Sequence, residues 1–214
     1  MLSVGNIIAG SDTTAAALTA VFYCLLKSPT SLAKLRDEIE SAVETGDLSF
    51  PASFKQASAL HYLHAVIHEA MRMHPPVGLP LQRVVPAGGY QIGDHFYPGG
   101  TVVGVPALAV HMNTSIFGSD AALFRPERWL DSDKDKLATM QRYWMPFGLG
   151  SRTCIGKNIS ILEISKSVPE LVTKFDFELT DGLEKDGEEM RWYDMWFVRP
   201  VALPVKIRIR QENA

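Results

Sequence analysis

Residues 147–160, FGLGSRTCIGKNIS, place Cys154, one of the chain's two cysteines, inside a glycine-rich turn. A phosphate-binding loop follows the pattern G-x-x-x-x-G-K-[ST]. Here Gly150 and Gly156 enclose five residues, and an asparagine follows the lysine. A dinucleotide-binding loop would require a third glycine where this chain has Thr153. The turn lacks both nucleotide-binding patterns, so its cysteine needs another explanation.

The local chemistry of this turn favours a thiolate that binds a metal. A helix is predicted to begin near Gly156, which places Cys154 where free amides and the helix dipole stabilise an anion. Glycines allow backbone amides and a flat ligand to approach the sulfur, and Arg152 adds a cation that can pair with a carboxylate. These features suit the axial cysteinate of a haem iron. The alternative is a glycine-rich turn around a buried free cysteine.

The complete pattern F-x-x-G-x-R-x-C-x-G at residues 147–156 resembles the haem-binding signature of the cytochromes P450, the haem-thiolate monooxygenases. The resemblance implies that Cys154 is the iron ligand of a haem b cofactor. It also implies that Arg152 pairs with a haem propionate and that Phe147 packs beside the thiolate. The other loop residues implied to contact the cofactor are Pro146, Gly148, Ile155 and Gly156.

The segment HEAMRMH, residues 68–74, nearly spells the zinc-protease motif H-E-x-x-H, but Arg72 stands where the second histidine should be. His61, His64 and His68 line one side of the same predicted helix. Three histidines on one helix face could bind zinc. A zinc hydrolase is therefore kept as an alternative function.

The resemblance to the cytochromes P450 gives the same segment another meaning. Glu69 and Arg72 match the family's Glu-x-x-Arg motif, and Arg128 of FRPERW (residues 124–129) matches the arginine that joins them. A buried network of this kind requires every charge to be paired, because losing one member leaves the others unpaired. Its implied role is to hold the cysteine-containing loop in place.

Residues 9–14, AGSDTT, match the family's pattern [AG]-G-x-[DE]-T-[TS] for the I helix. The small residues Ala9 and Gly10 would leave room for a flat macrocycle. The Thr13 hydroxyl can reach the carbonyl of Ala9 and loosen the helix locally. Asp12 and Thr13 resemble the pair that delivers protons during dioxygen activation. The alternative is a hydroxyl bonded to its own helix, with a nearby solvent contact.

The segment PVGLPLQR, residues 76–83, follows the Glu-x-x-Arg helix. Its Arg83 stands where the family places a second propionate-binding arginine. Val77, Gly78 and Leu79 stand where family members line the substrate pocket. Apolar side chains at these positions imply an apolar substrate edge.

The expected fold is mainly α with small β-sheets, and it corresponds to the C-terminal portion of the cytochrome P450 fold, from the I helix through the L helix and the final strands. Residues 1–214 would form one partial domain. Its parts are the I helix (1–27), the K helix (58–74), β hairpins (77–105), the P-E-R-W segment (124–129), and the cysteine loop with the L helix (147–175). Further predictions are helices over 30–45, 54–59, 106–112 and 120–124, a solvated loop over 131–136, strands over 175–179 and 205–209, and an acidic loop over 181–189.

Composition excludes several other classes of protein. The chain has 214 residues, is 46% hydrophobic and carries a formal net charge of −3, so a nucleic-acid partner is not expected. Two cysteines cannot form a four-cysteine metal site, and Cys24 is predicted to be a core residue. The longest apolar run, residues 15–26, is short for a membrane span, and no signal peptide is recognised.

The implied function is haem-thiolate monooxygenation, in which one atom of dioxygen enters a small lipophilic substrate by hydroxylation or demethylation and the other leaves as water. The electrons would come from NADPH-cytochrome P450 reductase, an oxidoreductase partner. Residues 159–179 resemble fungal microsomal members related to pisatin demethylases, which implies secondary metabolism and a full-length parent at the endoplasmic reticulum membrane.

Members of this family are about twice as long, and the segment before the I helix has no counterpart here. We therefore expect a fragment whose first helix and cysteine loop expose apolar faces. Such a chain should be poorly stable and should bind haem weakly or not at all. A non-catalytic truncated piece of a monooxygenase is accordingly an alternative to an active enzyme.

Overall fold

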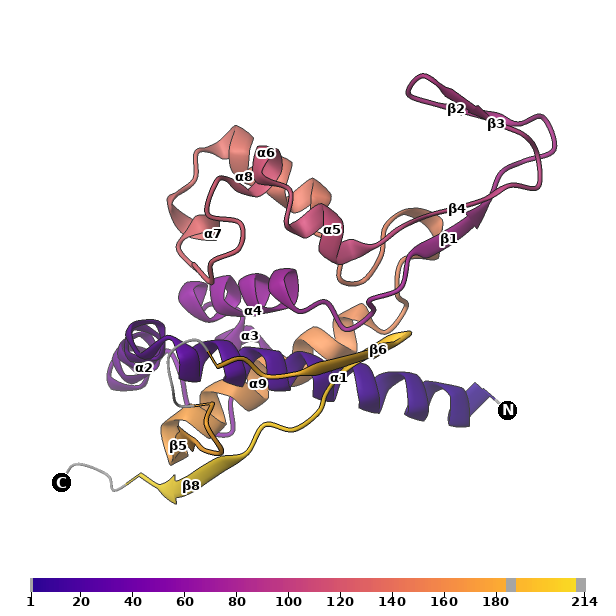
Figure 1. Cartoon of the computed structure of the whole chain (residues 1–214). Coiled ribbons are helices and arrows are strands. Elements are labelled where there is room, and N and C mark those ends of the chain that lie inside the picture. Colours follow the sequence, from indigo (N-terminus) through magenta and orange to yellow (C-terminus); the bar gives the residue numbers. More distant parts are fainter. Residues whose placement is uncertain (1, 184–187, 211–214) are drawn as a thin grey trace.

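The computed structural model describes residues 2–183 and 188–210. Within this part the chain is mainly helical, with small two-stranded antiparallel sheets (Figure 1). Helix α1 (Leu2–Lys27) crosses the middle of the molecule, and α4 (His61–Met73) and α9 (Lys157–Lys174) pack against it. The other helices are α2 (Pro29–Glu44), α3 (Phe54–Ala57), α5 (Ala107–His111), α6 (Thr114–Phe117), α7 (Arg128–Asp131), α8 (Lys134–Tyr143) and the 3₁₀ turn η1 (Gly150–Arg152).

Helix α1 has a buried half and an exposed half. Ala17, Val21 and Leu25 are fully buried against neighbouring elements, whereas Ile7 and Ile8 near the other end are exposed. In the described part of the chain, α1 alone is long and apolar enough to cross a membrane. Its C-terminal half instead packs on α2, α4 and α9, as a core helix does.

Helix α4 is held at its start by another helix. The carboxylate of Glu38 in α2 accepts hydrogen bonds from the backbone amides of Tyr62 (2.7 Å) and Leu63 (2.9 Å). These amides have no acceptor within α4, because the first turn of any helix leaves its N–H groups unpaired. Helix α4 begins at His61 and not at residue 58, where the sequence predicted its start. The preceding residues 54–57 form the separate helix α3, which has its own capping box at Ser53.

The eight strands in the described part of the chain form antiparallel pairs. Within residues 77–105, β1 (Leu81–Val84) pairs with β4 (Val102–Val105), and β2 (Tyr90–Ile92) pairs with β3 (His95–Tyr97). The β2–β3 hairpin extends away from the helical body (Figure 1). Near the C-terminus the two predicted strands are present as β5 (Phe175–Leu179) and β8 (Val205–Ile209), and they pair with each other. The pair β6 (Trp192–Met195) and β7 (Phe197–Pro200) was not predicted.

Two local predictions were wrong. Residues 120–124 form a turn instead of a helix, because Arg128 donates hydrogen bonds to the carbonyls of Asp120 (3.0 Å) and Leu123 (3.2 Å). The charged run 131–136 is not a loop throughout, since the Asp133 carboxylate caps α8 by accepting from the Lys136 amide at 2.9 Å. Helix α9 continues through Pro169 to its end at Lys174.

Two other expectations concern the core and the acidic loop. Cys24 is 4% exposed and belongs to the main hydrophobic core, as predicted. Burial raises the pKa of its thiol far above the ordinary value, so it stays protonated and unreactive. Residues 184–187 of the expected acidic loop lie outside the described residues.

Candidate functional site

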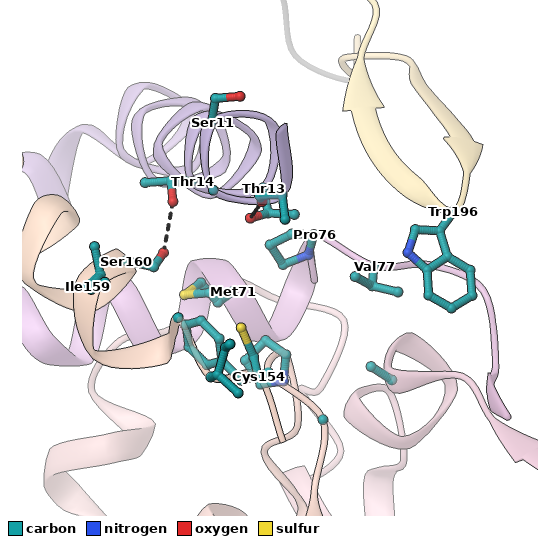
Figure 2. A pocket seen from close by; sticks show the side chains of 18 of the residues that line it. Ser11, Thr13, Thr14, Met71, Pro76, Val77, Cys154, Ile159, Ser160 and Trp196 are labelled. Carbon is teal, nitrogen blue, oxygen red and sulfur yellow. Dashed lines mark hydrogen bonds between the residues drawn. The ribbon is translucent and has the colours of Figure 1, made fainter. Parts of the chain in front are cut away.

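A pocket of about 1040 Å³ lies between α1, β1, the start of α9 and the cysteine loop, which we define as residues 146–156. Figure 2 shows it from close by, with Thr13 on α1 and Cys154 on the cysteine loop directed into the same space. Trp196, at the tip of the β6–β7 hairpin, lines it from another side. Several parts of the chain that are far apart in sequence therefore converge on one cavity.

The cysteine loop presents the thiol of Cys154 to the pocket in an exposed position. The Cys154 amide donates to the Phe147 carbonyl at 2.9 Å, which closes the loop on itself. Gly148 and Gly150 have φ angles of +69° and +72°, which side chains other than glycine adopt only with strain. Helix α9 begins at Lys157, so Cys154 lies just before a helix N-terminus.

Two arginines, Arg83 from β1 and Arg152 from η1, line the pocket. Neither forms an ion pair with a carboxylate among the described residues. Arg83 Nη1 only donates to the neighbouring carbonyl of Gln82 at 2.7 Å. Two cations beside an otherwise largely apolar cavity are suited to a ligand that combines an apolar body with carboxylates. The remaining loop residues Pro146, Phe147, Gly148, Ile155 and Gly156 also line it.

The α1 side of the pocket consists of small and hydroxyl side chains. Ala9, Gly10 and Thr13 line the pocket, and Thr13 Oγ1 donates to the carbonyl of Ala9 at 2.7 Å, the contact expected from the sequence. Asp12 is not among the lining residues. Its carboxylate instead accepts a hydrogen bond from Arg199 of β7. The structure therefore separates Asp12 from Thr13, although the two are adjacent in sequence.

The three residues expected to meet the substrate have different positions. Val77 lines the pocket, whereas Gly78 and Leu79 do not. Gly78 is covered by the β6–β7 hairpin, because its amide donates to the Trp196 carbonyl at 3.3 Å and a side chain there would collide with Asp194. Trp196 was missed by sequence reasoning, although the aromatic-rich run 192–197 could have indicated a structured element.

Beneath the pocket, Glu69, Arg72 and Arg128 meet as a fully buried network. Arg72 forms two hydrogen bonds of 2.9 Å to the Glu69 carboxylate, and Arg128 Nε forms a third of 2.9 Å. The indole N–H of Trp129 adds another at 2.9 Å. The carboxylate of Glu69 is therefore saturated with donors, which is the condition for burying such a charge.

A fourth charge, Asp120, completes this network and was missed by sequence reasoning. Its Oδ1 accepts from Arg128 at 2.8 Å, and its Oδ2 forms an ion pair with the more exposed Arg125 at 2.6 Å, so Asp120 connects the buried network to a guanidinium group nearer the surface. The hydrogen bond from Arg128 lowers the pKa of Asp120. Burial alone would lower the pKa of Arg128, but the charges of Glu69 and Asp120 outweigh it and raise that pKa. No sequence pattern marks Asp120, because it lies in a turn outside the motifs.

The zinc interpretation has no geometric support. In the described part of the chain, no three His, Cys, Asp or Glu side chains converge on a point that could hold a metal ion. The ring of His68 stacks on Trp144 at 4.3 Å, and its Nδ1 is 2.8 Å from the His64 carbonyl. His68 thus packs against an aromatic residue instead of joining His61 and His64 around a metal ion, so a zinc hydrolase is not supported.

The comparisons with known proteins agree with this arrangement. The profile of the cytochrome P450 family matches residues 1–202, and the chain belongs to that family. Over 197 residues it is 48% identical to a pisatin demethylase of Fusarium vanettenii, covering 91% of this chain and 36% of that protein. It is 45% identical over 205 residues to the cytochrome P450 monooxygenase cicH of Emericella nidulans, covering 96% of this chain and 40% of that protein. The chain thus spans well under half the length of these relatives.

Proposed function

We propose that this chain forms the thiolate side of a haem-dependent monooxygenase that hydroxylates or demethylates a small lipophilic substrate. The observation that carries the proposal is the exposed thiol of Cys154 in a largely apolar pocket that also contains Arg83 and Arg152 without acidic partners among the described residues. A haem has a flat apolar ring, an iron that binds thiolate, and two propionates. The thiol therefore matches the iron, the apolar cavity matches the ring, and the two arginines match the two propionates.

The cysteine loop would hold the haem through its shape and its sulfur. When bound, haem supplies the dioxygen chemistry that inserts one oxygen atom into the substrate. Cys154 would bind the iron, and the guanidinium groups of Arg83 and Arg152 would each bind a propionate. Gly156 lies beside the sulfur, since a Cβ at this position would make van der Waals contact with it at 3.8 Å. Pro146, Phe147 and Ile155 would pack against the ring edge.

Thr13 would relay protons across the α1 side of the pocket. Its hydroxyl donates to the Ala9 carbonyl, and rotation about the side chain redirects the same proton into the cavity. Ala9 and Gly10 keep this part of α1 free of bulk. Asp12 would supply protons from solvent, and its carboxylate can approach Thr13 only after its ion pair with Arg199 opens.

The proposed substrate class and redox partner rest on membership of the cytochrome P450 family and not on one particular contact. Val77 presents an apolar side chain to the pocket, which supports a lipophilic substrate. The electron donor would be NADPH-cytochrome P450 reductase, and the full-length protein would act at the endoplasmic reticulum membrane. The pisatin demethylase relative supports oxidative demethylation as one candidate reaction.

The proposal is tested by alkylating the full chain with iodoacetamide, with and without haem. Cys24 is buried and protonated, so it serves as an internal control, while Cys154 should react readily. Although the sequence predicts weak haem binding by a fragment, a saturating concentration of haem should protect Cys154 from alkylation, and the reduced, carbon monoxide-treated sample should show the Soret band typical of thiolate ligation. Both effects should be absent in Cys154→Ser. Equal alkylation of Cys154 with and without saturating haem would instead favour the non-catalytic fragment.

A further inference from the structure

His111, at the end of α5, is fully buried and uses both ring nitrogens. The Met145 amide lies 2.9 Å from Nε2, and the Arg72 carbonyl lies 2.9 Å from Nδ1. A backbone amide can only donate, so Nε2 must accept and the ring proton must reside on Nδ1, which donates to Arg72. The network thus specifies one neutral tautomer. A residue that is only filling space would not need both contacts.

These contacts connect the buried charge network to the cysteine loop. Arg72 Nη1 donates to the His111 carbonyl at 2.8 Å, so the two residues each bind the other's backbone. On the other side, Met145 directly precedes the loop, and its carbonyl accepts from Gly148 at 3.0 Å. The Phe147 carbonyl then accepts from Cys154 at 2.9 Å. These hydrogen bonds, together with the backbone of residues 145–148 that links them, therefore connect Arg72 through His111 to the backbone of Cys154.

We propose that His111 is a positioning residue that fixes the start of the cysteine loop, and through it Cys154, relative to the Glu69–Arg72 pair. The loop contains glycines at positive φ and has few alternatives for anchoring its first residues. Its anchor must accept a hydrogen bond from Met145 inside an apolar core, where an unpaired amide is costly. The role of Cys154 as an iron ligand rests on the proposed function, whereas the anchoring of the loop does not.

Three substitutions separate the two hydrogen bonds of the ring. In His111→Gln the amide oxygen extends about as far from the backbone as Nε2 and can accept from Met145. In His111→Asn the shorter amide can still donate to Arg72, but it cannot reach Met145. His111→Phe keeps a ring of similar size and loses both bonds. Comparing Gln with Asn isolates the contact to the loop, and it remains informative if the Phe variant does not fold.

The measurement is hydrogen exchange of the Met145 amide in the full chain without haem, resolved by NMR. Exchange should be about tenfold faster in His111→Asn and His111→Phe than in the wild type, because the buried amide loses its acceptor. His111→Gln should exchange at nearly the wild-type rate. Buried amides of α2, at Leu35 and Ile39, report on global unfolding and should not change.

The second readout is haem protection of Cys154 from alkylation, which should be lost in the Asn variant and retained in the Gln variant. The proposal is overturned if Met145 exchanges equally in the Asn and Gln variants. It is also overturned if all buried amides accelerate together, since that indicates a general structural role. If haem fails to protect Cys154 in the wild type, the proposed function fails, while the exchange rates still decide whether His111 anchors the loop.

Discussion

Glu69 in α4 and Arg128 in α7 form a hydrogen bond of 2.9 Å, and neither side chain is exposed, although they lie 59 positions apart in the chain. This contact joins the helix beneath the pocket to the segment that leads into α8. Because Arg72 also pairs with Glu69, and Asp120 also pairs with Arg128, each buried charge depends on the others for its compensation. Removing one member leaves an uncompensated charge in the core.

Replacing Arg128 by methionine should therefore lower the free energy of unfolding by about 3–5 kcal/mol, which is typical for breaking a buried ion pair. The matched control is Arg199→Met, which breaks the partly exposed pair with Asp12 and should cost no more than about 1 kcal/mol. Urea denaturation of both variants measures the difference. Similar losses in the two variants would show that the buried network contributes no special stability.

The stability of the protein should fall in mild acid because of buried histidines. Burial lowers the pKa of His111 to about 4 from its ordinary value of 6.5, and it outweighs the hydrogen bond to the Arg72 carbonyl, which acts in the opposite direction. The unfolded chain therefore takes up a proton before the folded one does, so the stabilising effect is complete above pH 6.5 and is lost as the pH falls towards 4. His74 is shifted in the same direction, also to about 4.

For His111 alone the loss between these pH values should be on the order of 3 kcal/mol. Urea denaturation at several pH values measures it, and His111→Gln, which cannot take up a proton, serves as the comparison. The stability of the variant should depend less on pH across this window. Parallel pH profiles for the two proteins would contradict the assignment to His111.

Two glycines near the pocket should respond oppositely to alanine. Gly10 lies in α1 with nothing within 4 Å of the place where a Cβ would lie, so Gly10→Ala should stabilise the helix by roughly 0.5–1 kcal/mol. Gly150 also has free space but a φ of +72°, so Gly150→Ala should destabilise the chain by about 1 kcal/mol. Thermal unfolding compares the variants. A stabilising Gly150→Ala would show that the loop relaxes out of the left-handed conformation.

The Glu38 carboxylate should stabilise the first turn of α4. Glu38→Ala removes the acceptor for the Tyr62 and Leu63 amides and should cost about 1–2 kcal/mol, similar to the loss of a helix cap. Glu40→Ala, in the same helix, removes only a partly exposed ion pair with Arg210 and should cost less than about 1 kcal/mol. Chemical denaturation distinguishes the two. Equal effects would mean that helix propensity in α2, and not capping of α4, dominates.

Much of the fold was predictable because the relevant patterns are local. Apolar spacing located α1 and α9, and the prolines at 75–76 marked the end of α4. The errors arose where hydrogen bonds of a polar side chain, which apolar spacing does not reveal, determined the backbone. Residues 120–124 turn because their carbonyls accept from Arg128, and the charged run before α8 becomes helical once Asp133 caps it.

The sequence by itself determined the family, the loop that presents Cys154 and the identity of Glu69, Arg72 and Arg128, because these depend on residue type at short and regular spacing. Only the tertiary structure decided which other groups pair with the charged and polar residues around the site. Asp12 pairs with Arg199 across 187 positions, Asp120 pairs with the buried Arg128, and His111 accepts from Met145. These contacts satisfy charges and amides that folding removes from water, and their partners are chosen by proximity in space, which no local pattern encodes.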